Sequence, residues 1–182
     1  MDGLLTAKER KELLKIARDT IVSHVSAVPV TEVEPSSPAL AAENGCFVTI
    51  KQNGQLRGCI GNFVSDKPLC RLVQEMAVSA ATRDPRFYPM KAPDLQNFDL
   101  EISVLSPLRR IDSVEEIQVG IHGIYIIKNS YRGVLLPQVA TEYGWDRESF
   151  LKHTCLKAGL PEDAWQKGCD IYIFSAQVFS ER

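Results

Sequence analysis

Apolar residues recur at helical spacing near the start of the chain. Beyond Thr6 they follow one another at intervals of three or four residues, the period of one helix face. Thr6 and Glu9 have the spacing of a capping box, in which each side chain satisfies a backbone N–H at the helix start. The pattern predicts a helix from about Thr6 to Ala27. The proline- and serine-rich stretch that follows predicts an irregular connector over residues 29–44.

Strand patterns occupy the next part of the chain. Residues 46–51 and 55–60 are strand-like runs separated by Gln52-Asn53-Gly54. Because Asn-Gly tolerates the positive φ angles of a type I′ turn, the two runs predict a hairpin. Residues 98–104 then alternate apolar and polar side chains, which predicts a strand with one buried face.

The second half of the chain repeats these signals. A second hairpin is predicted from residues 120–127 and 131–136, and a last strand from residues 171–178. Helices are predicted in three places: after Ser65 or Asp66, with Pro68 in the first turn; over residues 138–143; and after Asp146. Helices and hairpins do not alternate as strict βαβ units. The order therefore favours an α+β fold with antiparallel or mixed sheets and packed helices.

Composition places the chain among ordinary folded proteins. It has 182 residues, of which 45% are hydrophobic and 24% charged, close to globular averages. The formal net charge is −2, which gives no global field for a polyanion. We expect one domain over residues 1–182, with length enough for two lobes. No apolar run has the length of a signal peptide or membrane span, so we expect a cytoplasmic protein.

The cysteines and histidines show no metal-binding spacing. Five cysteines form an odd set without a Cys-x-x-Cys pair, and the three histidines are scattered. This pattern favours free thiols in a reducing compartment over disulfides or zinc, and it indicates no metal site. Common phosphate-binding loops and hydrolase motifs are also absent from the sequence, so no cofactor can be assigned.

The strongest candidate for chemistry is the segment Leu56 to Gly61. In a regular strand, Arg57 and Cys59 share one face, roughly 6.6 Å apart along the chain, while Leu56 and Ile60 point the other way. A nearby guanidinium favours a thiolate, which would make Cys59 a nucleophile and Arg57 an anchor for an anion. The structural alternative is a small buried cysteine, an ion-paired arginine and glycines that mark a bulge.

This segment, Leu-Arg-Gly-Cys-Ile-Gly, resembles the signature of the AMMECR family, named for the Alport syndrome, midface hypoplasia and elliptocytosis chromosomal region. Further blocks resemble that family in the same order over nearly the whole chain, and the Leu-Leu-Pro-Gln-Val spelling at residues 135–139 resembles archaeal and bacterial members. The resemblance implies an α+β fold in two lobes with a cleft. It also implies an unsettled activity and an association with Memo-like and radical-SAM proteins.

Other candidate residues lie outside this segment. Arg83, Asp84 and Arg86 surround a proline at a predicted helix end, where the arginines could bind a carboxylate or phosphate. The alternative is that Asp84 accepts backbone N–H bonds and pairs with an arginine to fix the loop. Glu101 is a candidate general base or a strand-face ion-pair partner. His122 is a candidate base or a structural residue in an apolar strand.

Three functional classes remain open at this point. An enzyme would use Cys59 as nucleophile, His122 or Glu101 as base, and an arginine to anchor the substrate. A binding module would use the same cleft for a small ligand, a nucleotide or an RNA segment. A regulatory scaffold would use the motif blocks for stability alone. We favour the enzyme, acting through a cleft around Cys59.

Overall fold

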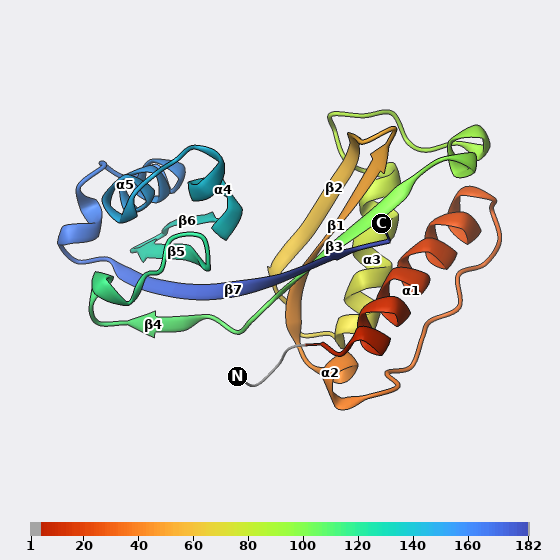
Figure 1. Ribbon diagram of the computed structural model, residues 1–182, viewed down its shortest axis with the longest axis horizontal. Coiled ribbons are helices and arrows are strands. Elements are labelled where there is room, and N and C mark those ends of the chain that lie inside the picture. Colours follow the sequence, from red (N-terminus) through yellow and green to blue (C-terminus); the bar gives the residue numbers. More distant parts are fainter. Residues whose placement is uncertain (1–4, 182) are drawn as a thin grey trace. The chain divides into compact units, whose positions relative to one another are not determined.

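The computed structural model describes residues 5–181 (Figure 1). Contacts divide the chain into two compact units. Unit 1 runs up to Leu105 and resumes at Gln177, and unit 2 comprises Ser106–Ala176. Strands pair antiparallel in both units, and helices pack against them. The predicted α+β fold with antiparallel sheets and packed helices is therefore confirmed.

Unit 1 begins with the predicted helix. Helix α1 spans Ala7–Val25, and Thr6 and Glu9 form the capping box that the sequence indicates. The connector then contains a short helix that was not predicted, α2 (Pro38–Ala41), capped by Ser37. It also ends slightly earlier than predicted, because strand β1 starts at Asn44.

The first hairpin forms as predicted. Strands β1 (Asn44–Gln52) and β2 (Gln55–Val64) are joined by Asn53 and Gly54, both with positive φ. Helix α3 (Leu69–Thr82) ends where the pattern predicts, but its cap was predicted wrongly. Pro68 itself occupies the N-cap position, while the Ser65 hydroxyl accepts a hydrogen bond from the backbone N–H of Lys67.

The core of unit 1 lies between its sheet and two helices. After a 3-10 turn (η1, Ala92–Gln96), strand β3 (Asp99–Leu105) pairs with β1, and the sheet order is β2-β1-β3-β7. Alternate side chains of β1 and β3 are fully buried and share one apolar cluster with residues of α1 and α3. Of the intervening side chains, Ser103 and Leu105 are buried, whereas the others, including Thr49 and Glu101, are only partly buried. We call the side of the sheet that carries them the polar face.

Unit 2 is built around a second sheet. Strands β5 (His122–Lys128) and β6 (Tyr131–Leu135) form the second predicted hairpin, and β7 (Asp170–Ser180) pairs with β5. Helix α5 (Arg147–Lys157) is capped by Asp146 as predicted, and it buries Phe150 and Leu151. The remaining elements are β4 (Arg109–Ile111, not predicted), η2 (Val114–Glu116), α4 (Pro137–Glu142) and η3 (Ala164–Gln166).

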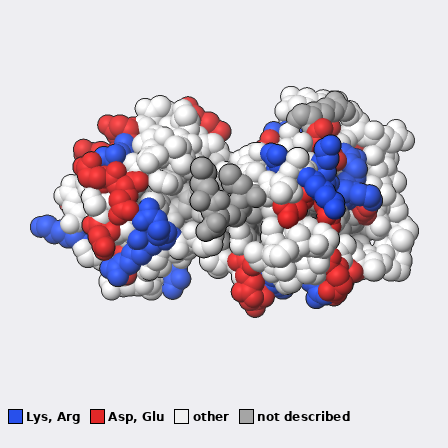
Figure 2. Space-filling model, turned by 60° about the horizontal axis from the view of Figure 1, so that its bottom comes forward, with Lys and Arg blue, Asp and Glu red and all other residues white. Residues whose placement is uncertain are grey.

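The surface carries charges of both signs. On the face shown in Figure 2, basic and acidic side chains lie next to one another in each unit. This mixture agrees with the small net charge and gives no single-sign surface on that face for nucleic-acid binding. Within residues 5–181, no helix has both the length and the apolar character required to span a membrane.

Candidate functional site

A row of three side chains crosses the polar face of the unit 1 sheet. Thr49 on β1 lies directly opposite Cys59 on β2 and directly opposite Glu101 on β3. The Thr49 hydroxyl donates a hydrogen bond of 3.2 Å to the Cys59 sulfur. Glu101 accepts one of 2.9 Å from the Lys51 ammonium group. The hairpin and β3 therefore bring a thiol, a hydroxyl and an ion pair together.

A bulge determines which side of the sheet the thiol faces. Near the turn, Lys51 pairs with Leu56, but Ile50 pairs with Gly58, so Arg57 is an extra residue in β2. Such an insertion shifts the alternation of the strand. Leu56 therefore lies opposite Lys51 and is 41% exposed. The prediction that Leu56 faces the same way as Ile60, which packs against the apolar cluster, is wrong.

Asp84 fixes the backbone of Cys59 from outside the sheet. Its buried carboxylate accepts a 2.9 Å hydrogen bond from the Cys59 N–H and two from the Arg86 side chain, at 3.0 and 2.7 Å. The Arg86 N–H donates a further bond. These donors, the Arg86 guanidinium first, hold the pKa of Asp84 well below its usual range. Asp84 thus has the loop-fixing contacts of the structural alternative.

This contact also explains the approach of Thr49 to the sulfur. The Cys59 N–H points toward Asp84 and away from β1, so Thr49 and Cys59 form a pair without mutual backbone hydrogen bonds. In antiparallel sheets the Cα atoms of such pairs lie only about 4.5 Å apart. The edge position of β2 therefore directs the thiol against the threonine hydroxyl.

The glycines of the signature have packing roles. A Cβ atom on Gly58 would lie 2.2 Å from the carbonyl oxygen of Ala80 in α3. A Cβ atom on Gly61 would lie 2.4 Å from the carbonyl oxygen of Cys46 and from the Phe47 ring. Both positions need glycine because neighbouring groups occupy the space of a side chain.

Arg57 of the signature segment and Arg86 of the loop after α3 differ in their contacts. Arg57 has a side chain that is 16% exposed, with Nη2 3.6 Å from Asp94 Oδ2. Its Nη1 is buried and has no hydrogen-bond partner among the described residues. No described hydrogen bond joins Arg57 to Cys59. The pKa of Arg86 is raised, mainly by its hydrogen bonds to Asp84 and to a smaller extent by the Cys59 sulfur. Arg86 thus lies near Cys59 through Asp84, which bonds both the Cys59 N–H and the Arg86 side chain.

The remaining candidates, Arg83 and His122, make no described contact with Cys59, Thr49 or Glu101. The exposed Arg83 follows α3, and its side chain makes no ion pair or hydrogen bond with the described residues. His122 begins β5 in unit 2, where its Nδ1 accepts a 3.1 Å hydrogen bond from the Gln118 N–H. Burial, and then the charge of Arg109, lower its pKa. The convergence of His122 with Cys59 stays a prediction, as does the cleft.

Cys59 differs from the other cysteines of unit 1. Cys46 and Cys70 are fully buried, and burial raises the pKa of both thiols, that of Cys46 to about 12. Cys59 is partly exposed on the polar face. Among residues 5–181, no group of three His, Cys, Asp or Glu side chains could hold a metal ion.

Comparisons with known proteins identify the family. The family model described as AMMECR1 matches residues 14–179. A protein of Methanopyrus kandleri, MK0488, is 44% identical, with 100% of this chain and 92% of the relative covered. Another from Methanosarcina barkeri, Mbar_A1807, is 40% identical, covering 98% of this chain and 93% of that protein. The chain belongs to the AMMECR family, as the resemblance of its motifs predicts.

A solved structure also matches. The crystal structure of the uncharacterized protein PH0010 from Pyrococcus horikoshii superposes with a TM-score of 0.82 at 37% identity, covering 94% of this chain and 90% of that one. The fold is therefore that of an AMMECR-type protein. The archaeal sources of these relatives agree with the residue spelling at 135–139.

Proposed function

We propose that unit 1 is the catalytic part of an enzyme that uses Cys59 as a nucleophile toward a small anionic substrate. The proposal is carried by one observation: Cys59 is the partly exposed thiol on a polar face, whereas Cys46 and Cys70 lie in the apolar core. Catalytic thiols require access and a polar environment, and buried structural thiols lack both.

The neighbours of the thiol support this role. The Thr49 hydroxyl donates a hydrogen bond to the sulfur and so orients the thiol on the polar face. Arg86, whose side chain is 55% exposed, provides positive charge nearby. In the proposed step the sulfur bonds to an electrophilic atom of the substrate. The thiol proton passes to water, and the leaving group departs with the bonding electron pair.

Site-specific alkylation tests the nucleophile. The folded protein is treated with less than one equivalent of iodoacetamide, and the modified cysteine is identified by mass spectrometry. The sulfur then bonds to the reagent carbon, and iodide leaves. We expect Cys59 to react first, ahead of the partly exposed Cys169 of unit 2, whose pKa is raised by burial. Equal labelling of the two, or protection of Cys59, would contradict a nucleophilic role.

The charge of the substrate is tested with a matched reagent pair. Iodoacetate and iodoacetamide differ mainly in charge. The rate of alkylation by iodoacetate is divided by the rate by iodoacetamide at Cys59 and at Cys169, and the ratio at Cys59 is then divided by the ratio at Cys169. This quotient reports the electrostatic field at Cys59 relative to that at Cys169. We expect this quotient to exceed one and to decline with added salt, because exposed charges are screened. A quotient of one at low salt would remove the support for an anionic substrate.

A scaffold is the second candidate, and specific contacts favour it. The bond from Cys59 N–H to Asp84 and the close packing of Gly58 on Ala80 are both structural. If stability is the whole role of the motif, Cys59→Ser should act as a folding variant. A Cys59→Ser protein with unchanged unfolding behaviour and lost cellular function would favour the enzyme.

A further inference from the structure

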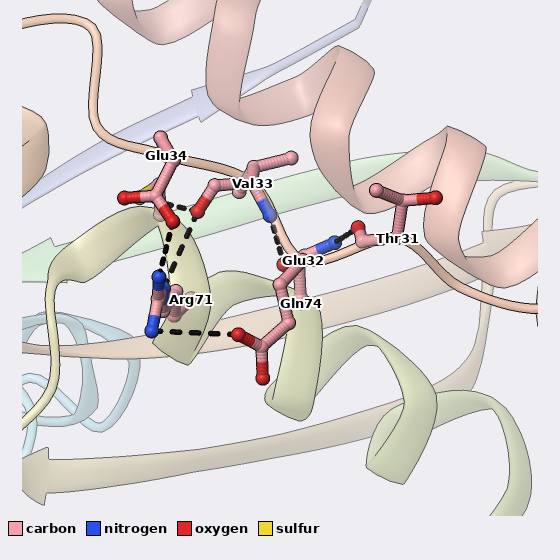
Figure 3. Close-up of polar contacts among 7 residues, drawn as sticks. Thr31, Glu32, Val33, Glu34, Arg71 and Gln74 are labelled. Atoms are coloured by element: carbon pink, nitrogen blue, oxygen red, sulfur yellow. Dashed lines mark hydrogen bonds and ion pairs between the residues drawn. The ribbon is translucent and has the colours of Figure 1, made fainter.

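The connector after α1 is held on the protein as an extended peptide. We call residues 28–37 the strap. Gln74 of α3, only 8% exposed, accepts a hydrogen bond from the Val33 N–H at 3.1 Å and donates one to the Thr31 carbonyl at 2.9 Å (Figure 3). In an extended chain, residues two apart direct their backbone groups to the same side. The glutamine amide therefore pairs with one edge of the strap as a neighbouring strand would.

The other edge of the strap is unpaired. Among the described residues, no hydrogen bond reaches the backbone groups of Val30, Glu32 or Glu34. These residues alternate with Thr31 and Val33, so their N–H and C=O groups point away from Gln74. An unpaired edge of extended backbone is a template on which a further strand can form.

Two hollows are lined in part by the strap, and a further hollow adjoins the larger of them. The first, lined by Val30 and Glu32, and the second, next to Asp66 and Lys67, have volumes of about 470 Å³ each. The third, next to Pro29 and Thr31, has a volume of about 240 Å³. The third shares Val30 and Gln74 with the first, and the first shares Asp66 and Lys67 with the second. Connection through shared walls favours an elongated occupant over a compact small molecule.

The charges along these hollows are mainly acidic. Their lining contains four carboxylates, of Asp19, Glu32, Asp66 and Glu75, and two cations, of Lys67 and Arg71. Arg71 pairs with both Glu32 and Glu34, whose side chains are 77% and 80% exposed, and Lys67 pairs with Glu75. Asp19 pairs with Lys15, so with Glu34 and Lys15 included there are five carboxylates and three cations, an excess of negative charge that favours a basic occupant.

We propose that the strap is a docking edge for a basic, extended peptide segment of another protein. The segment adds as a strand along Val30, Glu32 and Glu34, and its Lys or Arg side chains, two residues apart, lie near the two glutamates. This site uses none of the residues proposed for thiol chemistry.

Binding is tested with a fluorescein-labelled eight-residue peptide that alternates valine and lysine, followed by anisotropy. We expect the Glu32→Gln/Glu34→Gln double variant to bind on the order of three- to tenfold more weakly, the range for two exposed ion pairs. The matched control, Glu142→Gln/Glu162→Gln, removes two exposed carboxylates from unit 2 and should bind like the wild type. Equal effects of the two double variants would overturn the proposal.

The backbone contact is tested separately. The same peptide with N-methyl groups on every second amide keeps its charge but cannot form one edge of hydrogen bonds. We expect the methylated peptide to bind at least about tenfold more weakly than the unmethylated one. Amide exchange should slow at Glu32 and Glu34 on binding of the unmethylated peptide. Two methylated peptides are made, one with the odd-numbered and one with the even-numbered amides methylated. If both bind as tightly as the unmethylated peptide, or if amide exchange at Glu32 and Glu34 is unchanged, strand addition is ruled out. Cys59→Ser should leave the binding unaltered, which separates this test from that of the enzyme.

Discussion

The carboxylate of Asp84 accepts a 2.9 Å hydrogen bond from the backbone N–H of Cys59, 25 residues earlier in the chain. This bond joins two of the motif blocks that identify the family, the Arg-Gly-Cys-Ile-Gly segment and the loop after α3. It also occupies a donor at the edge of β2, which among residues 5–181 pairs with β1 alone. A buried side chain at this place both orients the thiol and blocks strand addition there.

Replacing the carboxylate should destabilise unit 1. Asp84→Asn loses the charge that Arg86 pairs with and weakens the bond to Cys59, so we expect a loss of about 2 kcal/mol. Urea unfolding followed by pulsed alkylation of Cys46 and Cys70 reports on unit 1 alone, because both thiols are buried there. The control Asp66→Asn, at an exposed carboxylate, should change little. Equal losses in the two variants would contradict this role.

The same carboxylate should make the stability of unit 1 depend on pH in the acid range. The folded pKa of Asp84 is depressed, so its stabilisation is complete above the pKa of an unfolded aspartate, about 3.9. It is lost as the pH falls from there toward the folded pKa. We expect the stability difference between wild type and Asp84→Asn to shrink as the pH falls from 5 toward 2.5. A constant difference over this range would argue against an ionised Asp84.

A methyl group at Gly58 should separate β2 from α3. Its Cβ would overlap the Ala80 carbonyl, and overpacking of this kind costs about 1–3 kcal/mol. Gly54→Ala is the matched control, because that Cβ meets nothing within 4 Å and only the positive φ is unfavourable, at roughly 1 kcal/mol. Unfolding monitored through Cys46 should rank Gly58→Ala as the less stable. The reverse order would mean that α3 can move aside.

Removing the Thr49 hydroxyl should slow the alkylation of the Cys59 thiol. The hydroxyl donates to the Cys59 sulfur, so Thr49→Val is expected to lower the rate of iodoacetamide alkylation at Cys59 about three- to tenfold at pH 7. Thr49→Ser keeps the donor and should retain most of the rate. The rate at Cys169 serves as the internal reference. A valine variant that reacts as fast as the serine variant would show that the hydrogen bond is unimportant.

Unit 2 should lose stability as His122 takes up a proton. Its pKa is lowered in the folded state, so the histidine contributes stability above the unfolded pKa of about 6.5 that is lost as the pH falls. Both tryptophans, Trp145 and Trp165, belong to unit 2, so their fluorescence follows this unit alone. We expect the urea midpoint to fall between pH 8 and 5.5 in the wild type and in the control His24→Gln, but less in His122→Gln. Equal pH dependence in all three would contradict the prediction.

Much of the fold could be predicted because its signals are local. The capping box of Thr6, the Asn53-Gly54 turn and the cap at Asp146 depend on residues within a few positions of each other. Short elements were missed. Strand β4 has three residues and exists because it pairs with β7, about sixty residues later, which no local pattern reveals.

The site was harder to predict, and the bulge at Arg57 shows why. A two-residue turn with regular pairing would place Cys59 opposite Val48, a buried residue. The extra residue places it opposite Thr49 instead, on the polar face. Thr49 itself was missed as a contact of the thiol, since its role depends on this shift. The outward direction of Cys59 thus rests on the register between β2 and β1, which the local alternation of β2 does not reveal.

Strand β7 determines how the chain could be cut into separately expressed units, because it contributes residues to both. Its first residues belong to unit 2, and from Gln177 on it belongs to unit 1, where it is the neighbour of β3. Unit 2 is thus an insertion within the sequence of unit 1. A protein fragment that ends at Leu105 would lack β7, so β3 would be an unpaired edge strand that is prone to self-association. An autonomous unit 1 would need residues 177–181 grafted back through a short linker, whereas residues 106–176 are contiguous and can be excised in one piece.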